Sequence, residues 1–368
     1  MKIAIIGSRG YPYVYSGYET FVKELAERLV TKNVMVTVYC HKNLFNQYPK
    51  QLGGINLVYI QTIEKKTLSQ FVHSLQSMLH ACFSRYDIIL VVNSANGPFG
   101  LFSKLFRKKT AINVDGLEWL RPKWKGLGAK YFYWASKLST LLYDEVITDS
   151  DEMHKIYLKE FNSPSTVIAY GANIRYSQNS SLINKWALKE NDYYLIVGRL
   201  IPDNNADIIV GEFISSNSTK KLVIVGDVPY DDAYALSIKS IKDSRLVFTG
   251  YVNDQNELAE LYHNCFAYFH GHEFGGTNPT MLKALAYGCA ILALETVFNY
   301  EMLDSGKYGL FFCKNTGDAK NLIEKVENNP EVLFEYRSKS RQRIVENYTW
   351  EKIVAQYYTL FNQILNGK

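Results

Sequence analysis

Strand-like and helix-like segments alternate along almost the whole chain, and this alternation limits the folds that it can adopt. Short runs rich in Val, Ile and Leu, such as 3–6, 88–92 and 110–114, are typical of buried strands. Between them lie segments with the apolar period of helices, such as 17–30 and 68–83. Repeated strand–helix–strand units build mostly parallel sheets with helices on both faces. The sequence therefore predicts an α/β protein with doubly wound, Rossmann-like sheets.

The alternation is interrupted once, by a polar stretch at 172–192 that contains few apolar residues. Such a composition is typical of a linker. The chain has 368 residues, enough for two domains with separate cores. We therefore expect domains at 1–172 and 173–349 and a final helix at 350–368. Beyond a strand predicted at 290–293, the remaining sequence predicts only helices.

Composition excludes several classes of protein. No apolar run approaches the roughly 18 residues that a membrane-spanning helix needs, and the first strand is too short for a signal peptide. The five cysteines lie far apart and form no CxxC pair, which favours buried free thiols in a reducing compartment. The sequence shows no pattern of residues typical of a metal site. We expect a cytoplasmic protein.

The loop at 270–283, HGHEFGGTNPTMLK, joins a predicted buried strand to a predicted helix. Gly275 and Gly276 permit a tight turn, and Thr277 or Asn278 can cap the helix. The N-terminus of a helix presents free N–H groups and a partial positive charge, which suit a phosphate or a sugar hydroxyl. An ordinary strand-to-helix turn would have the same sequence pattern.

A second glycine-bearing loop, at 7–17, also follows a strand and opens a helix. It lacks the GxGxxG pattern and is too long for a dinucleotide-binding turn, and no acid ends the second strand to hold a ribose. These features exclude a nicotinamide-dependent enzyme, and the chain contains no P-loop.

The segment 101–137 combines positive charge with aromatic residues. It contains nine Lys or Arg against Asp115 and Glu118, a net charge of +7, and eight aromatic side chains. This pattern suits an anionic lipid surface or a pyrophosphate-bearing ligand, and equally a solvated basic face over core aromatics. No nucleic-acid-binding module accompanies the charge, so we do not expect nucleic acid as a partner.

Six stretches, in this order, make the chain resemble the family 4 retaining glycosyltransferases of the GT-B fold. More narrowly, it resembles the bacterial rhamnosyltransferases of capsule and O-antigen assembly. The stretches are 7–25 (GSRGYPYVYSGYETFVKEL), 113–124 (NVDGLEWLRPKW), 148–150 (TDS), 169–172 (AYGA), 197–205 (VGRLIPDNN) and 270–279 (HGHEFGGTNP).

The resemblance implies two Rossmann-like domains facing a central cleft, with the final helix packed back on the first domain. The first domain would lie on the acceptor side, and a nucleotide-diphosphate sugar would bind mainly to the second. No metal or other cofactor is implied. The implied donor-binding residues are Ser16, Gly17, Arg199, Asn204, Gly250, Tyr251, Val252, Gly275, Gly276, Thr277, Asn278 and Lys283.

The resemblance implies that three of these positions take part in the reaction. Arg199 would hold the diphosphate and stabilise the charge that develops on it. Glu273 would be the acid near the sugar. Asp115, where many relatives have a histidine, would orient a hydroxyl or the acceptor, although a structural aspartate in a turn fits equally well.

Two positions depart from the family pattern. Asn204 replaces a lysine, which leaves less positive charge for the diphosphate. Lys283 replaces the acid that accepts hydrogen bonds from the ribose hydroxyls. An ammonium group only donates hydrogen bonds, so Lys283 weakens donor binding, reaches the diphosphate instead, or marks a decayed site.

The resemblance thus predicts a retaining enzyme that moves a sugar such as rhamnose to a lipid-linked saccharide, near the inner face of the cell membrane. The expected acceptor and membrane side comprises Trp119, Arg121, Lys123 and Trp124. The alternatives are a transferase of the same fold that uses a UDP-hexose, and a non-catalytic relative that binds glycans or a partner.

Overall fold

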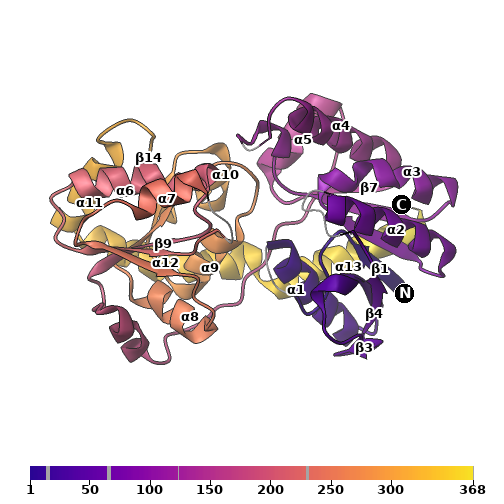
Figure 1. Ribbon diagram of the computed structural model, residues 1–368, viewed down its shortest axis with the longest axis horizontal. Coiled ribbons are helices and arrows are strands. Elements are labelled where there is room, and N and C mark those ends of the chain that lie inside the picture. Colours follow the sequence, from indigo (N-terminus) through magenta and orange to yellow (C-terminus); the bar gives the residue numbers. More distant parts are fainter. Residues whose placement is uncertain (14–16, 64–67, 123, 229–231, 368) are drawn as a thin grey trace. The chain divides into compact units, whose positions relative to one another are not determined.

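The computed structural model of the protein describes residues 1–13, 17–63, 68–122, 124–228 and 232–367. The chain forms two compact units (Figure 1). Unit 1 comprises Met1–Tyr170 and Trp350–Lys368, and unit 2 comprises Gly171–Thr349. The sequence predicted that the first domain ends at 172 and the second at 349.

A mostly parallel sheet forms the centre of unit 1. Its described part has eight strands in the order β3-β4-β2-β1-β5-β6-β7-β8. All neighbouring pairs are parallel except the short pair of β3 and β4. The strands are β1 (Lys2–Ile6), β2 (Met35–His41), β3 (Gln51–Leu52), β4 (Ile55–Ile60), β5 (Ile88–Val92), β6 (Thr110–Val114), β7 (Glu145–Thr148) and β8 (Thr166–Val167).

Helices connect these strands, and the last helix of the chain returns to them. The helices are α1 (Gly17–Thr31), α2 (Leu68–Phe83), α3 (Gly100–Leu105), α4 (Leu127–Leu142), α5 (Asp151–Phe161) and α13 (Trp350–Asn366). Helix α13, yellow in Figure 1, packs against α1, where the Phe21 and Tyr357 rings lie 5.4 Å apart. Asn113, in β6, also donates to the Tyr357 hydroxyl at 2.9 Å. These contacts join the C-terminal helix to the core of unit 1.

Unit 2 contains a wholly parallel sheet of six strands among its described residues, in the order β11-β10-β9-β12-β13-β14. The strands are β9 (Tyr193–Val197), β10 (Lys221–Val225), β11 (Leu246–Gly250), β12 (Ala267–His270), β13 (Ile291–Leu294) and β14 (Gly309–Phe312). The helices are α6 (Ala206–Ser215), α7 (Ala233–Lys239), α8 (Gln255–Asn264), α9 (Pro279–Tyr287), α10 (Val297–Met302), α11 (Asp318–Asn328) and α12 (Glu331–Arg343). The predicted class, α/β with two parallel sheets, is confirmed.

The last strand, β14, corrects the sequence-based prediction of helices alone after 290–293. Its four residues pair with β13 in parallel register. Two of them are partly exposed, because β14 is the edge of the sheet. A run this short and this close to glycines carries a weak strand signal, and its place at the sheet edge decides its structure.

The polar stretch 172–192 also differs from the prediction, because most of it docks on unit 2. A 3₁₀ helix at Ser180–Trp186 buries Ile183. The Glu260 carboxylate in α8 accepts hydrogen bonds from the backbone N–H groups of Gln178 and Asn179, at 2.6 and 2.9 Å. The stretch satisfies its polar groups on a neighbouring helix, which composition alone could not indicate.

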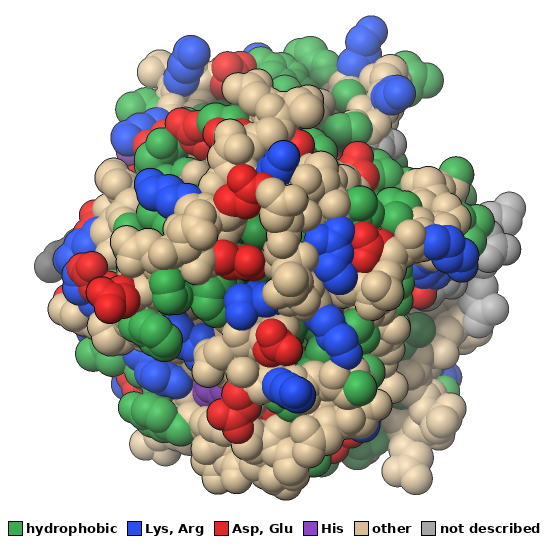
Figure 2. Space-filling model, turned by 90° about the vertical axis from the view of Figure 1, so that its left-hand side faces the viewer, with side chains coloured by type: hydrophobic (Ala, Val, Ile, Leu, Met, Phe, Trp, Pro, Cys, Tyr) green, Lys and Arg blue, Asp and Glu red, His purple; other side chains and the backbone are tan. Residues whose placement is uncertain are grey.

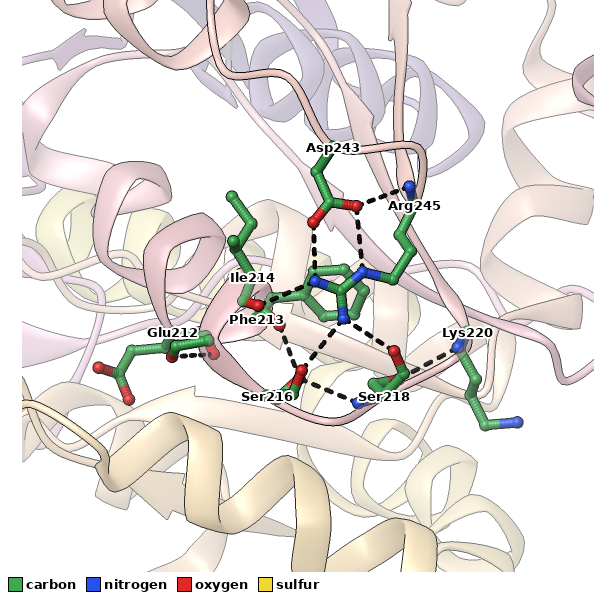
Figure 3. Close-up of polar contacts among 9 residues, drawn as sticks. Glu212, Phe213, Ile214, Ser216, Ser218, Lys220, Asp243 and Arg245 are labelled. Atoms are coloured by element: carbon green, nitrogen blue, oxygen red, sulfur yellow. Dashed lines mark hydrogen bonds and ion pairs between the residues drawn. The ribbon is translucent and has the colours of Figure 1, made fainter.

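Arg245, just before β11, ties this edge of the sheet to the end of α6 (Figure 3). Its guanidinium pairs with the Asp243 carboxylate at 2.7 Å. It also donates to the carbonyl oxygens of Ile214, Ser216 and Ser218, at 2.9, 3.1 and 2.8 Å. One side chain thus satisfies three carbonyls in the last turn of α6 and just beyond it.

We expect Arg245→Ala to destabilise unit 2 by about 2–3 kcal/mol, because it leaves the Asp243 charge and several carbonyls without their partner. Urea unfolding monitored by tryptophan fluorescence measures the loss, with Arg245→Lys as the matched control that keeps the charge. An unchanged urea midpoint for Arg245→Ala would contradict the proposed role.

Two surface properties bear on partners. Within the described ranges, no helix is both long and apolar enough to cross a membrane. On the face that Figure 2 shows, acidic and basic side chains are interspersed without a large patch of one sign. The segment 101–137, in contrast, has nine basic residues against two acidic ones in its sequence.

Candidate functional site

The strand order of unit 2 locates its candidate site. From β9 the chain builds the sheet outward through β10 and β11, and it then returns to add β12, β13 and β14 on the other side. The order therefore reverses between β9 and β12, which are hydrogen-bonded neighbours. In open parallel sheets, ligands bind beyond the carboxyl ends of the strands at such a switch point. The loops that follow β9 and β12 are 198–205 and 271–278, the two stretches singled out in the sequence of this half.

The turns after β9 and β10 require glycine. A Cβ on Gly226 would lie 2.1 Å from the carbonyl oxygen of Gly198, and Gly226 has a φ of +116°. The Gly198 N–H donates to the Val225 carbonyl oxygen at 3.0 Å, and the Gly226 N–H donates to the Gly250 carbonyl oxygen at 2.8 Å. The three strand ends are therefore held close together, and Gly250 itself has a φ of +65°.

Arg199 follows Gly198 directly. Its side chain is exposed, and its guanidinium makes no hydrogen bond or ion pair with any residue that the structure describes. A permanently charged, planar donor group with no protein partner at a switch point is well suited to bind a phosphate.

Asn204 and Asn205 brace the turn that carries Arg199. The Asn204 amide donates to the Arg199 carbonyl oxygen at 2.8 Å, and its oxygen pairs with His272 Nδ1 at 2.8 Å. Asn205 donates to the Gly271 carbonyl oxygen at 2.8 Å. Both asparagines thus join the loop after β9 to the loop after β12. Asn204, predicted to bind donor, has both ends of its amide engaged in this support.

Glu273 pairs with a residue that the sequence did not indicate. Its Oε2 lies 2.6 Å from Lys314 Nζ, and the two side chains are 29% and 41% exposed. The Glu273 backbone N–H also donates to the Asp203 carbonyl oxygen at 3.1 Å. Lys314 lies just after β14, so it brings a positive charge to the loops where Asn204 supplies none.

The glycine turn leads into α9 as predicted. Gly275 has a φ of +111°, which favours glycine, and Gly276 and Thr277 are buried. Asn278, rather than Thr277, is the N-cap: its side chain accepts from the Thr280 N–H at 2.9 Å. The capped helix directs its N-terminus toward the loop after β12, a favourable environment for an anion.

His270, at the end of β12, cannot add positive charge at neutral pH. It is 2% exposed, and burial lowers its pKa to about 3. His270 therefore adds no positive charge to that of Arg199 and Lys314.

The remaining predicted donor residues lie around β11 and α9. Tyr251 is 69% exposed just beyond β11, and the following Val252 is buried. Lys283 is half-buried in α9, and burial and the nearby charge of Arg175 lower its pKa. Lys283 makes no hydrogen bond or ion pair with another described residue.

Unit 1 has its own switch point, between β1 and β5. A Cβ on Gly7 would lie 2.3 Å from the Val92 carbonyl oxygen, so the loop after β1 passes directly over the end of β5. The Arg9 N–H donates to buried Glu19 in α1 at 3.1 Å. Gly17 begins α1. Ser16, predicted beside the phosphates, lies outside the described residues.

Asp115 follows β6 and is held by two tyrosines. Its carboxylate accepts from the Tyr18 hydroxyl and, at 2.7 Å, from the Tyr170 hydroxyl. Burial, followed by the negative charge of Asp115, raises the pKa of Tyr170 well above its usual range. Two phenols therefore fix the carboxylate at the strand end, in an orientation that only the fold reveals.

Three of the predicted acceptor residues make packing or polar contacts within unit 1. Glu118 joins two of them: it pairs with Arg121 Nε at 3.0 Å and accepts from Trp124 Nε1 at 2.7 Å. The Trp119 ring lies 5.9 Å from that of Phe161. These contacts give the three residues a structural role. Lys123 lies outside the described residues.

Groups of three or more His, Cys, Asp and Glu side chains that could hold a metal are absent from the part of the chain that the structure describes. All five cysteines are free, and four of them are buried. A metal-independent reaction stays a prediction.

Comparison with known protein families divides the chain in two. Residues 1–173 match the family described as a domain of unknown function (DUF1972), and residues 179–349 match the family described as glycosyl transferases group 1.

Individual proteins are similar to the chain at low identity. An uncharacterized glycosyltransferase of Methanocaldococcus jannaschii is 21% identical over 288 residues, which is 72% of this chain and 71% of that protein. The O-antigen chain mannosyltransferase C of Escherichia coli is 23% identical over 222 residues, 57% of this chain and 58% of that enzyme. The chain thus matches little more than half of the mannosyltransferase.

A crystal structure of Anabaena HepE in complex with UDP has a TM-score of 0.78 and 15% identity, and it covers 99% of this chain and 100% of its own. This likeness shows the fold, and the GT-B class predicted from the sequence is confirmed.

Proposed function

Because its second domain belongs to the glycosyl transferases group 1 family, we propose that this glycosyltransferase moves a deoxysugar such as rhamnose from a nucleoside diphosphate to a lipid-linked saccharide. The proposed setting is the assembly of a surface polysaccharide, and the similarity to an O-antigen mannosyltransferase supports it. Binding of a nucleoside diphosphate donor is supported by the UDP complex of the similarly folded HepE.

One observation carries the proposal. The exposed, unpartnered guanidinium of Arg199 and the capped N-terminus of α9 follow two adjacent strands at the switch point of unit 2. Together they offer one full and one partial positive charge to a diphosphate. The hydrogen bonds of Asn204 to His272 and of Asn205 to Gly271 hold the two loops together, so the site is organised before a ligand binds.

The reaction we propose retains the anomeric configuration. The bond between the anomeric carbon and the diphosphate oxygen breaks, and the acceptor hydroxyl oxygen bonds to that carbon on the same face. The acceptor proton passes to the leaving phosphate. Arg199 stabilises the charge that develops on this phosphate, Glu273 contacts the sugar, and Asp115 orients the acceptor hydroxyl.

A donor panel in a thermal-shift assay tests the proposal. We expect dTDP-rhamnose at 100 times its Kd to stabilise the protein by about 2.7 kcal/mol, since it binds only the folded state. UDP-glucose, UDP-N-acetylglucosamine, GDP-mannose and the free nucleotides complete the panel.

The panel also separates the alternatives. Stabilisation by a UDP-hexose alone would replace rhamnose with a hexose as the donor sugar. Stabilisation by no nucleotide sugar, together with binding to glycans, would identify a non-catalytic relative, which the lysine at position 283 favours. Transfer to a saccharide acceptor, followed by mass spectrometry, decides whether a bound donor is also a substrate.

We further propose that the segment 101–137 contacts anionic lipid. Leu127 is 85% exposed and Trp134 is 57% exposed, and Lys137 Nζ lies 5.2 Å from the Trp134 ring centroid. Apolar side chains beside lysines suit the interface of a charged bilayer.

Sedimentation with vesicles of phosphatidylglycerol tests this contact. We expect the protein to bind at low salt and to be released as salt screens the charges. Trp134→Ala should reduce the bound fraction, with phosphatidylcholine vesicles as the control. Absence of binding to phosphatidylglycerol at low salt would contradict the proposed membrane contact.

A further inference from the structure

Two cationic side chains of unit 2, Lys283 and Arg175, lie near each other along the C-terminal half of α9. Lys283 and Tyr287 are four residues apart on this helix and therefore share a face. The Arg175 guanidinium lies over the Tyr287 ring, 6.0 Å from its centroid. The Arg175 backbone N–H also donates to the Ala286 carbonyl oxygen at 3.4 Å. The fold thus brings together charges that are more than 100 residues apart in sequence.

Neither cation has an acidic partner among the described residues. Arg175 donates to the Gln255 carbonyl oxygen at 3.5 Å and to Asn256 Oδ1 at 3.0 Å, and both acceptors are neutral. Lys283 makes no hydrogen bond or ion pair with another described residue. The pair therefore keeps most of its hydrogen-bonding capacity.

The acids of the neighbouring α8 are engaged elsewhere. Glu260 accepts from the backbone N–H groups of Gln178 and Asn179 and from the Ser177 hydroxyl, at 2.6, 2.9 and 2.7 Å. Glu257 pairs with Lys185 at 2.5 Å. Both carboxylates hold the 172–192 stretch on α8, so they are not free to neutralise Lys283 and Arg175.

Holding two like charges together in a half-buried place costs free energy, and an anion between them would relieve this cost. The lowered pKa of Lys283 reflects the same conflict, through burial and the charge of Arg175.

We propose that Lys283 and Arg175 form a binding site for the phosphate group of a ligand, so that this end of the donor site recognises an anion where an acid would recognise ribose hydroxyls. The identification of that ligand as a nucleoside diphosphate sugar rests on the proposed function. The affinity of the pair for phosphate does not, because it can be measured with pyrophosphate alone.

Isothermal titration with pyrophosphate, UDP, dTDP and the two nucleosides tests the inference on the full chain. We expect Lys283→Gln and Arg175→Gln each to weaken binding of pyrophosphate and of the nucleoside diphosphates roughly 10- to 100-fold, as expected for loss of a charge-assisted hydrogen bond. Lys283→Arg should retain binding, and Lys283→Glu should abolish binding of pyrophosphate. Binding of the nucleosides should not change in Lys283→Gln.

Lys325→Gln, an exposed lysine on α11 of the same unit, is the matched control for loss of one positive charge. Circular dichroism establishes that each variant is folded. Unchanged pyrophosphate affinity in Lys283→Gln would overturn the inference, as would tighter nucleotide binding by Lys283→Glu.

The variant Arg199→Gln separates the two proposals. If nucleoside diphosphates bind and depend on Arg199 but not on Lys283, the inference about Lys283 and Arg175 fails and the proposed function stands. If pyrophosphate depends on Lys283 but no nucleoside diphosphate or nucleotide sugar binds, the anion site stands and the proposed function fails. If the unmodified protein binds none of these ligands, both fail.

Discussion

Replacing Arg199 with glutamine is expected to lower kcat for sugar transfer roughly 100- to 1,000-fold, the usual effect of removing one donor that stabilises a developing anion. The guanidinium has no partner among the described residues, so its loss should leave the fold intact and act on the reaction. Because the charge on the leaving diphosphate is largest in the transition state, kcat should fall more than KM rises. Steady-state kinetics with the donor identified by the panel measures both constants.

Two further variants sharpen this test. Arg199→Lys keeps the charge and loses the planar, bidentate geometry, so its kcat should lie between those of the unmodified enzyme and Arg199→Gln. Lys325→Gln, the exposed α11 lysine, controls for the change in net charge. A kcat for Arg199→Gln within threefold of the unmodified enzyme would be incompatible with direct contact between Arg199 and the leaving group.

Acid is expected to destabilise unit 1 well above the pH at which most carboxylates are protonated. His41, in β2, and His73, in α2, are buried, and their rings stack at 3.7 Å. Burial lowers the pKa of His41 to about 4, and burial together with His41 lowers the pKa of His73 to about 3, from an ordinary value of 6.5. Among the charged groups near the pair, Arg9 also opposes protonation of His41.

Below pH 6.5 the unfolded chain takes up protons at both histidines, whereas the folded chain does not, so stability falls as the pH falls. The slope is about 1.4 kcal/mol per pH unit for each histidine, and it flattens only as the pH reaches the folded pKa values. By pH 4.5 the pair should have cost roughly 3–5 kcal/mol.

Urea unfolding between pH 7.5 and 4.5 measures this slope. His73→Phe removes one of the two titrating groups, and it should make the slope shallower whatever it does to stability at pH 7.5. Equal slopes for the unmodified protein and His73→Phe would show that His73 does not stay neutral in the fold.

The sequence was most informative where a local pattern repeats. The strands at 88–92 and 110–114 and the helix at 68–83 were predicted with the bounds that the structure has. Apolar runs and helical periods report directly which face of an element is buried. The helix start after the glycine turn was also predictable, because Asn278 and Pro279 carry the chemistry of a cap.

The sequence was least informative where structure depends on a distant partner. The polar stretch 172–192 has the composition of a linker, but the Glu260 carboxylate in α8 holds its backbone. Lys314 lies 41 residues from Glu273 in sequence and 2.6 Å from it in space. No local pattern distinguishes such a lysine from any other lysine in an exposed turn.

For this protein the sequence by itself determined the α/β class, the two parallel sheets and the two loops that carry Arg199 and Glu273, since periodicity and turn chemistry are local properties. Only the tertiary structure decided which side chains meet at those loops. It paired Glu273 with Lys314 and engaged both ends of the Asn204 amide. It also set Lys283 beside Arg175 without a counterion among the described residues. Electrostatic interactions depend on distance in space and on burial, and neither is encoded at any single position of the chain.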